Sequence, residues 1–184
     1  MSAGQIPGYI AGTWTIDPAH SEIGFVVRHL MVSKVRGQFT KFEGSITTAD
    51  DPLQSTGTAT IDLGSINTNN EQRDGHLRSA DFFDADSHPT MTFTSTGLRQ
   101  SGDKFIATGD LTIRDITKPI ELEVEVNGFG PDPYGGTRAG LTATGQINRS
   151  DFGVTWNAAI EGGGVVVSEK VQLVLEVEAS LDKG

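Results

Sequence analysis

The chain has 184 residues, of which 36% are aliphatic or aromatic, and these values fit one globular domain and exclude a disordered chain. Its 14 lysines and arginines against 24 aspartates and glutamates give a formal net charge of −10. This charge argues against nucleic acid as a partner, because such binding depends on neutralising phosphates. Cysteine is absent, which excludes disulfides, thiolate metal sites and thiol nucleophiles.

The first residues carry no targeting pattern. Residues 1–11 read as an N-terminal tail ahead of one domain over residues 12–184, without the basic and apolar regions of a signal peptide. No window approaches the roughly 18 apolar residues that a membrane span requires. We therefore expect a cytoplasmic protein without stable membrane insertion, and a periplasmic or secreted one if the chain is a processed form.

Apolar and polar residues alternate along most of the chain, which is the pattern of strands with one buried face. Turn-forming residues separate the alternating stretches, and the glycine-rich segment 161–164 reads as a hairpin loop. Short connections indicate about eight antiparallel strands. The alternating stretches lie at 21–30, 35–39, 42–46, 59–63, 91–93, 105–113, 120–126, 139–147 and 171–177.

One stretch departs from this period. Thr68 and Glu71 match a capping box with Thr68 as the N-cap, and Arg73, Leu77 and Ala80 follow at helical spacing. We expect a single short helix that ends near Ala80 and crosses from one half of the sheet to the other.

Amphipathic antiparallel strands hide their apolar faces in a sandwich or a barrel, and closure removes the exposed edges. We therefore expect an all-β fold, a single extended eight-stranded antiparallel barrel of the lipocalin-like kind with one short crossover helix. Its inner face combines phenylalanines with small residues such as Gly37, Ala107, Gly109 and Ala139. Either these small residues leave a cavity, or they accommodate large neighbours in a filled barrel.

A hollow barrel of this kind has a long, narrow and apolar bore. Such a bore favours a guest with a long hydrocarbon chain, since each buried methylene contributes about 0.8 kcal/mol. The residues predicted to line it share inward parity on their strands. They are Phe25, Val27, His29, Val35, Phe39, Ile61, Met91, Phe93, Phe105, Leu111, Ile113, Leu122, Val124, Leu141, Leu173 and Leu175.

The four histidines lack the spacing of zinc ligands, and no nucleophile has a placed acid and base, so neither a metal nor a catalytic residue is predicted. His29 continues the inward parity to a strand end, where its imidazole either contacts a lipid headgroup or is satisfied by a neighbouring strand. Arg73, His76 and Arg78 on the helix are further candidate headgroup contacts. Equally, Arg73 and Asp74 tie the helix to the barrel.

Two other groups stand out. Arg28, Lys34, Arg36 and Lys41 cluster in one hairpin of an otherwise acidic chain, where they form a solvated outer face or meet an anionic headgroup or membrane surface. Five aromatic residues outside the alternation read as plugs and corners of the core, with one or two lining an opening. They are Trp14, Phe82, Phe83, Phe152 and Trp156.

The chain opens with the motifs 14–21, 23–29 and 35–39 and continues with 65–68, 73–77, 81–83, 109–113, 117–119 and 148–153. In this order and spacing they resemble the YceI-like family of bacterial lipocalin-like proteins, from about Gly12 to Leu181. The resemblance implies an extended eight-stranded barrel that binds polyisoprenoids or other long-chain lipids, usually as a homodimer. Family members are often periplasmic, and the N-terminus of this chain departs from that pattern.

The predicted function is non-enzymatic binding, sequestration or transport of a long-chain isoprenoid (a polyprenyl lipid or an isoprenoid quinone) or of a fatty-acyl lipid, with no other cofactor. Two alternatives stay open. One is an enzyme that uses the barrel as a hydrophobic reaction chamber with His29 as acid or base. The other is a ligand-free stress-response interaction module with a solid barrel.

Overall fold

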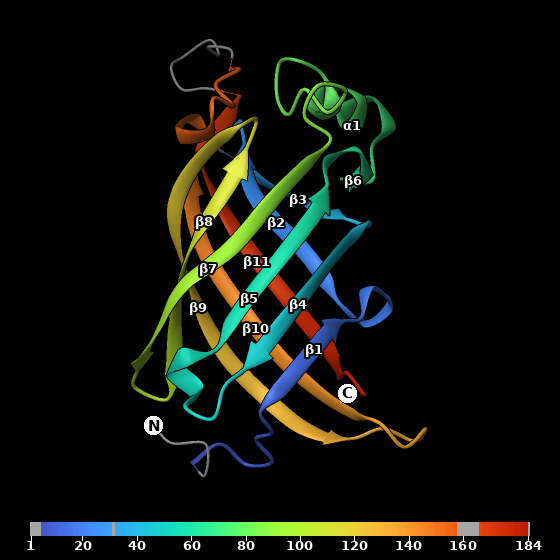
Figure 1. Ribbon diagram of the computed structural model, residues 1–184. Helices are drawn as coiled ribbons and strands as arrows, with labels where there is room; N and C mark the ends of the chain where they lie inside the picture. Colours follow the sequence, from blue (N-terminus) through green and yellow to red (C-terminus); the bar gives the residue numbers. More distant parts are fainter. Residues whose placement is uncertain (1–4, 31, 158–165, 184) are drawn as a thin grey trace.

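A computed structural model describes residues 5–30, 32–157 and 166–183, and the loop predicted at 161–164 lies outside these ranges. The described chain forms an antiparallel sheet that winds into a barrel, with α1 (Glu71–Arg78) over one end (Figure 1). The strands are β1 (Gly12–Ile16), β2 (Glu22–His29), β3 (Ser33–Phe39), β4 (Phe42–Thr48), β5 (Thr56–Asp62), β6 (Ile66–Asn67), β7 (Thr90–Ser101), β8 (Lys104–Ile113), β9 (Ile116–Pro131), β10 (Thr137–Asn148) and β11 (Val167–Leu181).

The ring closes because β1 pairs with both β4 and β11. Around the barrel the order is β1, β4, β5, β7, β8, β9, β10 and β11, which is the predicted eight-stranded antiparallel barrel. Three of these strands continue in the direction of α1 after a short break: β1 continues as β2, β4 as β3, and β5 as β6. In this part of the barrel, β3 pairs with both β2 and β6, and β2 also pairs with β11. The first three barrel strands are therefore each interrupted, whereas the last five are continuous.

The helix differs from its prediction at both ends. Asn70 is the N-cap, since its side chain accepts a hydrogen bond from the Arg73 N–H at 3.0 Å. The prediction of Thr68 as N-cap is wrong because the buried Thr68 donates both its N–H, at 2.9 Å, and its hydroxyl, at 2.5 Å, to the carboxylate of Asp74. The helix ends at Arg78, and Ser79 caps it in place of a further turn to Ala80.

The two clusters of buried apolar residues lie toward the α1 end of the barrel, whereas Trp14 is buried near the opposite end. The helix and the segment after it pack three side chains against the inner face of the sheet, those of Leu77, Phe82 and Phe83. Trp14 and Phe152 are each 1% exposed and, like Phe82, plug the core as predicted. Two buried clusters result: Ile23, Phe39, Ile61, Leu63 and Ile66, and Phe82, Leu111, Ile113, Phe152 and Val154.

Candidate functional site

Two apolar cavities lie inside the barrel. The upper cavity, toward α1, has a volume of about 180 Å³, and the lower cavity, toward the N-terminal segment, has a volume of about 240 Å³. They are neighbours along the bore because they share a belt of lining residues. The belt consists of Ile23, Ala59, Phe93, Leu122 and Leu175.

Small inward residues serve both of the purposes considered from the sequence. The rings of Phe25 and Phe93 occupy the space beside Gly37 and Gly109, where any side chain would overlap them. By contrast, alanines such as Ala107 and Ala139 line the lower cavity, where space is left. Gly37 and Gly109 thus mark filled positions of the barrel, whereas Ala107 and Ala139 border open space.

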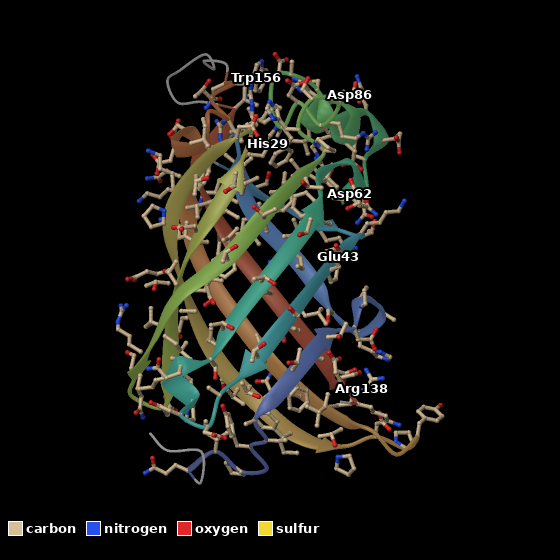
Figure 2. All side chains as sticks on the ribbon, in the orientation of Figure 1. His29, Glu43, Asp62, Asp86, Arg138 and Trp156 are labelled. Atoms are coloured by element: carbon tan, nitrogen blue, oxygen red, sulfur yellow. The ribbon has the colours of Figure 1, made fainter. Side chains whose placement is uncertain are left out.

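A third space, the mouth, opens between α1 and the ends of β2 and β3, with a volume of about 430 Å³. It shares Phe25, Val27 and Phe82 with the upper cavity, so the two are continuous in their lining. His29 and Trp156 lie at this end of the barrel (Figure 2), and both line the mouth. Trp156 is therefore one of the predicted aromatics that borders an opening.

Each residue predicted to line the bore borders one of these three spaces. His29 and Val35 border the mouth, Phe105, Val124 and Leu141 the lower cavity, and the others the upper cavity or its belt. Parity misses lining residues that come from outside regular strands, among them Leu77, Phe83 and Val154. Their helical or irregular segments have no period of two that would have revealed them.

Of the predicted headgroup contacts, His29, Arg73 and His76 line the mouth. Arg78 lies outside it and pairs with Glu71 at 3.2 Å. Arg73 donates to the Thr68 hydroxyl at 2.8 Å and to the Thr68 carbonyl at 2.7 Å, so it ties the helix to the segment that follows β6.

The two histidines of the mouth differ in their partners. His76 Nε2 lies 2.9 Å from an Asp81 carboxylate oxygen, and its ring packs edge-on against Trp156 at 4.8 Å between centroids. The imidazole of His29 makes no hydrogen bond or ion pair with any residue in the described ranges. Among the described residues, the neighbouring strands therefore offer the His29 ring no hydrogen-bond partner.

Arg149 is a buried cation. The alternation of apolar and polar residues did not predict its burial, because Arg149 lies just after the end of β10. It is 6% exposed and borders the upper cavity. Its guanidinium donates to the carbonyls of Val154 and Trp156, each at 2.9 Å. It also donates to Ser168 O at 2.8 Å and Val167 O at 3.2 Å. Burial lowers the pKa of Arg149, while these carbonyls stabilise its charge.

The predicted tail packs in part under the barrel. Ile6 and Tyr9 line the lower cavity, and the Tyr9 hydroxyl donates to the Ala49 carbonyl at 2.6 Å. The Phe129 ring contacts Tyr9 and Trp14 edge-on, with centroids 5.6 and 5.5 Å away. Residues 5–11 therefore cover the end of the bore opposite α1.

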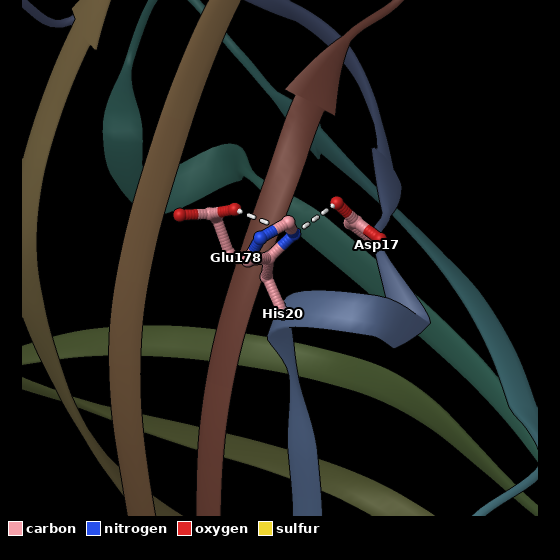
Figure 3. A group of neighbouring side chains, drawn as sticks. All are labelled: Asp17, His20 and Glu178. Carbon is pink, nitrogen blue, oxygen red and sulfur yellow. Dashed lines mark hydrogen bonds and ion pairs between the residues drawn. The ribbon is translucent and has the colours of Figure 1, made fainter. Parts of the chain in front are cut away.

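Asp17, His20 and Glu178 meet at the break between β1 and β2 (Figure 3), with potential metal-ligand atoms within 4.8 Å of one another. Arg138 already occupies their carboxylates, at 2.6 Å from Asp17 and 3.2 Å from Glu178. Its hydrogen bond, followed by that of His20, lowers the pKa of Asp17 to about 2. The cluster is an ion-pair network that fastens this break to β10 and β11.

The family model for the YceI-like domain matches residues 14–179 of this sequence. The chain belongs to the YceI-like family. It is 41% identical over 175 residues to the UPF0312 protein SAS2572 of Staphylococcus aureus, a match that spans 92% of this chain and 98% of that protein. None of the described helices of this YceI-like chain is long and apolar enough to cross a membrane.

Solved structures resemble this YceI-like barrel along most of its length. The Campylobacter jejuni YCEI protein superimposes with a TM-score of 0.73 at 34% identity, covering 91% of this chain and 96% of its own. A polyisoprenoid-binding domain from Saccharophagus degradans gives a TM-score of 0.70, covering 94% of this chain and all of its own. At 16% sequence identity, this superposition shows a common fold alone.

Proposed function

We propose that this protein binds one long-chain isoprenoid or fatty-acyl lipid inside its barrel and carries out no reaction on it. The observation that carries the proposal is the row of two apolar cavities that leads to a mouth with polar residues. The Saccharophagus degradans domain of the same fold, described as polyisoprenoid-binding, supports the same class of guest.

The guest lies with its hydrocarbon chain along the cavities and its polar end at the mouth. Burying a dozen methylenes contributes about 10 kcal/mol at roughly 0.8 kcal/mol each, which is comparable with the roughly 4–15 kcal/mol cost of association. A short chain would not offset that cost. At the mouth, His29 offers an imidazole without another partner in the described structure, so it can hydrogen-bond a carbonyl, hydroxyl or phosphate headgroup.

Binding is favoured over catalysis by the surroundings of His29. A histidine that acts as general base is oriented by a second group, ordinarily a carboxylate on its other ring nitrogen. Within the described residues, His29 has no such partner. The histidines that contact a carboxylate are His20, His76 and His88. Sequestration and transport are two uses of the same bound state.

Extraction of the purified protein with organic solvent, followed by mass spectrometry, tests the proposal. We expect a co-purified long-chain lipid, and the emptied protein should take up a fluorescent long-chain probe. Ala107→Phe, which fills part of the lower cavity, should reduce uptake, whereas Thr117→Phe on the exposed surface should not. Recovery of no lipid together with no probe uptake would overturn the proposed function.

A further inference from the structure

The tip of the β2–β3 hairpin is apolar where such a turn is ordinarily polar. Leu30 has a positive φ of 53°, a conformation that glycine and asparagine adopt most readily. It is 37% exposed, and Val32 is 82% exposed. The turn does not need an apolar side chain at either position, and leucine is strained at the positive φ of residue 30. The formation of the turn therefore does not explain why Leu30 and Val32 are apolar.

Exposed cations occur beside this tip and along the hairpin that leads away from it. Arg28 and Lys34 lie directly opposite each other across β2 and β3, a placement of like charges that costs stability. Arg36 follows on β3 and Lys41 directly precedes β4. None of the four forms an ion pair with a residue in the described ranges, although the chain carries 24 acidic residues. We call Leu30, Val32 and these four cations the hairpin patch.

The hairpin patch borders the mouth. Arg28 lines the mouth beside His29, and Leu30 follows His29 directly in the chain. On its β2–β3 side, the rim of the opening through which a lipid would pass is therefore apolar and positive, on a protein whose net charge is −10. The rest of the protein carries the net negative charge, so an anionic surface would repel it and attract the hairpin patch. The charge distribution therefore favours an orientation in which the patch faces that surface.

We propose that the hairpin patch docks the mouth onto an anionic lipid bilayer. Leu30 and Val32 insert at the interface, and Arg28 and Lys34, the cations next to the tip, lie against the phosphate headgroups. This combination of apolar and basic side chains is the one that interfacial binding uses. An acidic protein would match the cations and leave Leu30 and Val32 without a role. Docking goes beyond lipid binding, because it states where the guest is exchanged.

Co-sedimentation of the full chain, emptied of guest, with lipid vesicles tests this proposal. We expect association with phosphatidylcholine vesicles that contain phosphatidylglycerol, and much less with phosphatidylcholine alone or in high salt. The double variant Arg28→Gln, Lys34→Gln should lower the partition coefficient roughly 25-fold, because each cation near an anionic surface contributes roughly a factor of five. Leu30→Asn with Val32→Ser should lower it about tenfold.

The tip variant separates docking from misfolding. Asparagine tolerates positive φ better than leucine, so Leu30→Asn should leave the thermal unfolding temperature unchanged or raised while docking weakens. Tyr134→Ser, at an 88% exposed aromatic on the β9–β10 hairpin, is the matched apolar control. Arg99→Gln with Lys183→Gln is the matched charge control. Neither control should reduce association.

Three results would overturn the proposal. The first is no association of the wild-type chain with anionic vesicles, and the second is an equal loss in patch and control variants. The third is a loss with the cation variant and none with the tip variant, which would assign the patch to an acidic macromolecule. Because the protein is emptied of guest, none of these results depends on whether the barrel binds a lipid.

Discussion

Phe93 has the largest side chain in the belt between the two cavities. Its half-buried ring rests on Gly109, lies opposite Ala59 on the neighbouring strand and borders both cavities. A guest that occupies both cavities has to pass this belt. We therefore expect the Phe93 ring, as the largest side chain of the belt, to limit how far a hydrocarbon chain extends into the bore.

Replacement of Phe93 by alanine should join the cavities. We expect uptake to shift toward longer acyl probes, and the free energy of unfolding to fall by about 2–4 kcal/mol because a large, partly buried ring is lost. Competition between probes of two lengths and urea unfolding measure the two effects. Phe105→Ala is the control, since Phe105 is buried but borders the lower cavity alone. An equal shift in both variants would contradict the role of Phe93.

Arg149 stabilises the end of β10 through its carbonyl contacts. Arg149→Met should lower the free energy of unfolding by about 3 kcal/mol or more, because it leaves several buried carbonyls unpaired. The midpoint of guanidinium unfolding measures this loss. Arg99→Met removes an exposed ion pair with Glu121 and should cost less than about 1 kcal/mol. Similar losses in both variants would mean that Arg149 is not a structural cation.

At the scale of the elements, the first three barrel strands are unusual because each is interrupted by a short break. Between β1 and β2 the chain makes a short turn over Pro18–His20, where the Asp17 carboxylate accepts a hydrogen bond from the Ala19 N–H at 2.9 Å. Arg138 on β10 holds the same carboxylate from the other side. Ion pairs thus stabilise the break between β1 and β2, where the strand's backbone hydrogen bonds are interrupted.

This network predicts a specific acid sensitivity. The pKa of Asp17 lies at about 2 in the folded protein, below its ordinary value of 3.8, so its stabilising effect is complete above pH 3.8 and is lost as pH falls through 2. Asp17→Asn should be about 1–2 kcal/mol less stable than wild type at pH 7. The difference should vanish near pH 2. Chemical unfolding of both proteins across this range measures it, and a constant difference would contradict the assignment.

At the scale of the whole molecule, cavities that the protein's own side chains leave unfilled predict that a guest stabilises the barrel. Long-chain lipid at about 100 times its dissociation constant should add about 2.7 kcal/mol to the free energy of unfolding. For a domain of this length, that corresponds to a rise in Tm of about 5–10 °C. Thermal unfolding of emptied and reloaded protein measures the rise. An unchanged Tm with a lipid that demonstrably binds would place that lipid outside the barrel.

Local sequence alone determined the inward faces of the strands. The side-chain period of two is a property of each strand by itself, so Phe25, Leu122 and Leu173 could be assigned to the interior without knowing their neighbours. Barrel closure followed, because so many one-sided strands need a common interior. The YceI-like motifs added the class of guest but not its place in the bore.

Only the tertiary structure decided what depends on register between distant strands. It set the ring of Phe93 on Gly109, left space beside Ala107, and gave the Thr68 hydroxyl to Asp74 instead of the helix terminus. It also brought Arg149 to carbonyls of β11 and left the His29 ring facing the mouth. These contacts join residues far apart in the chain or compete with a local preference, so no pattern of spacing specifies them.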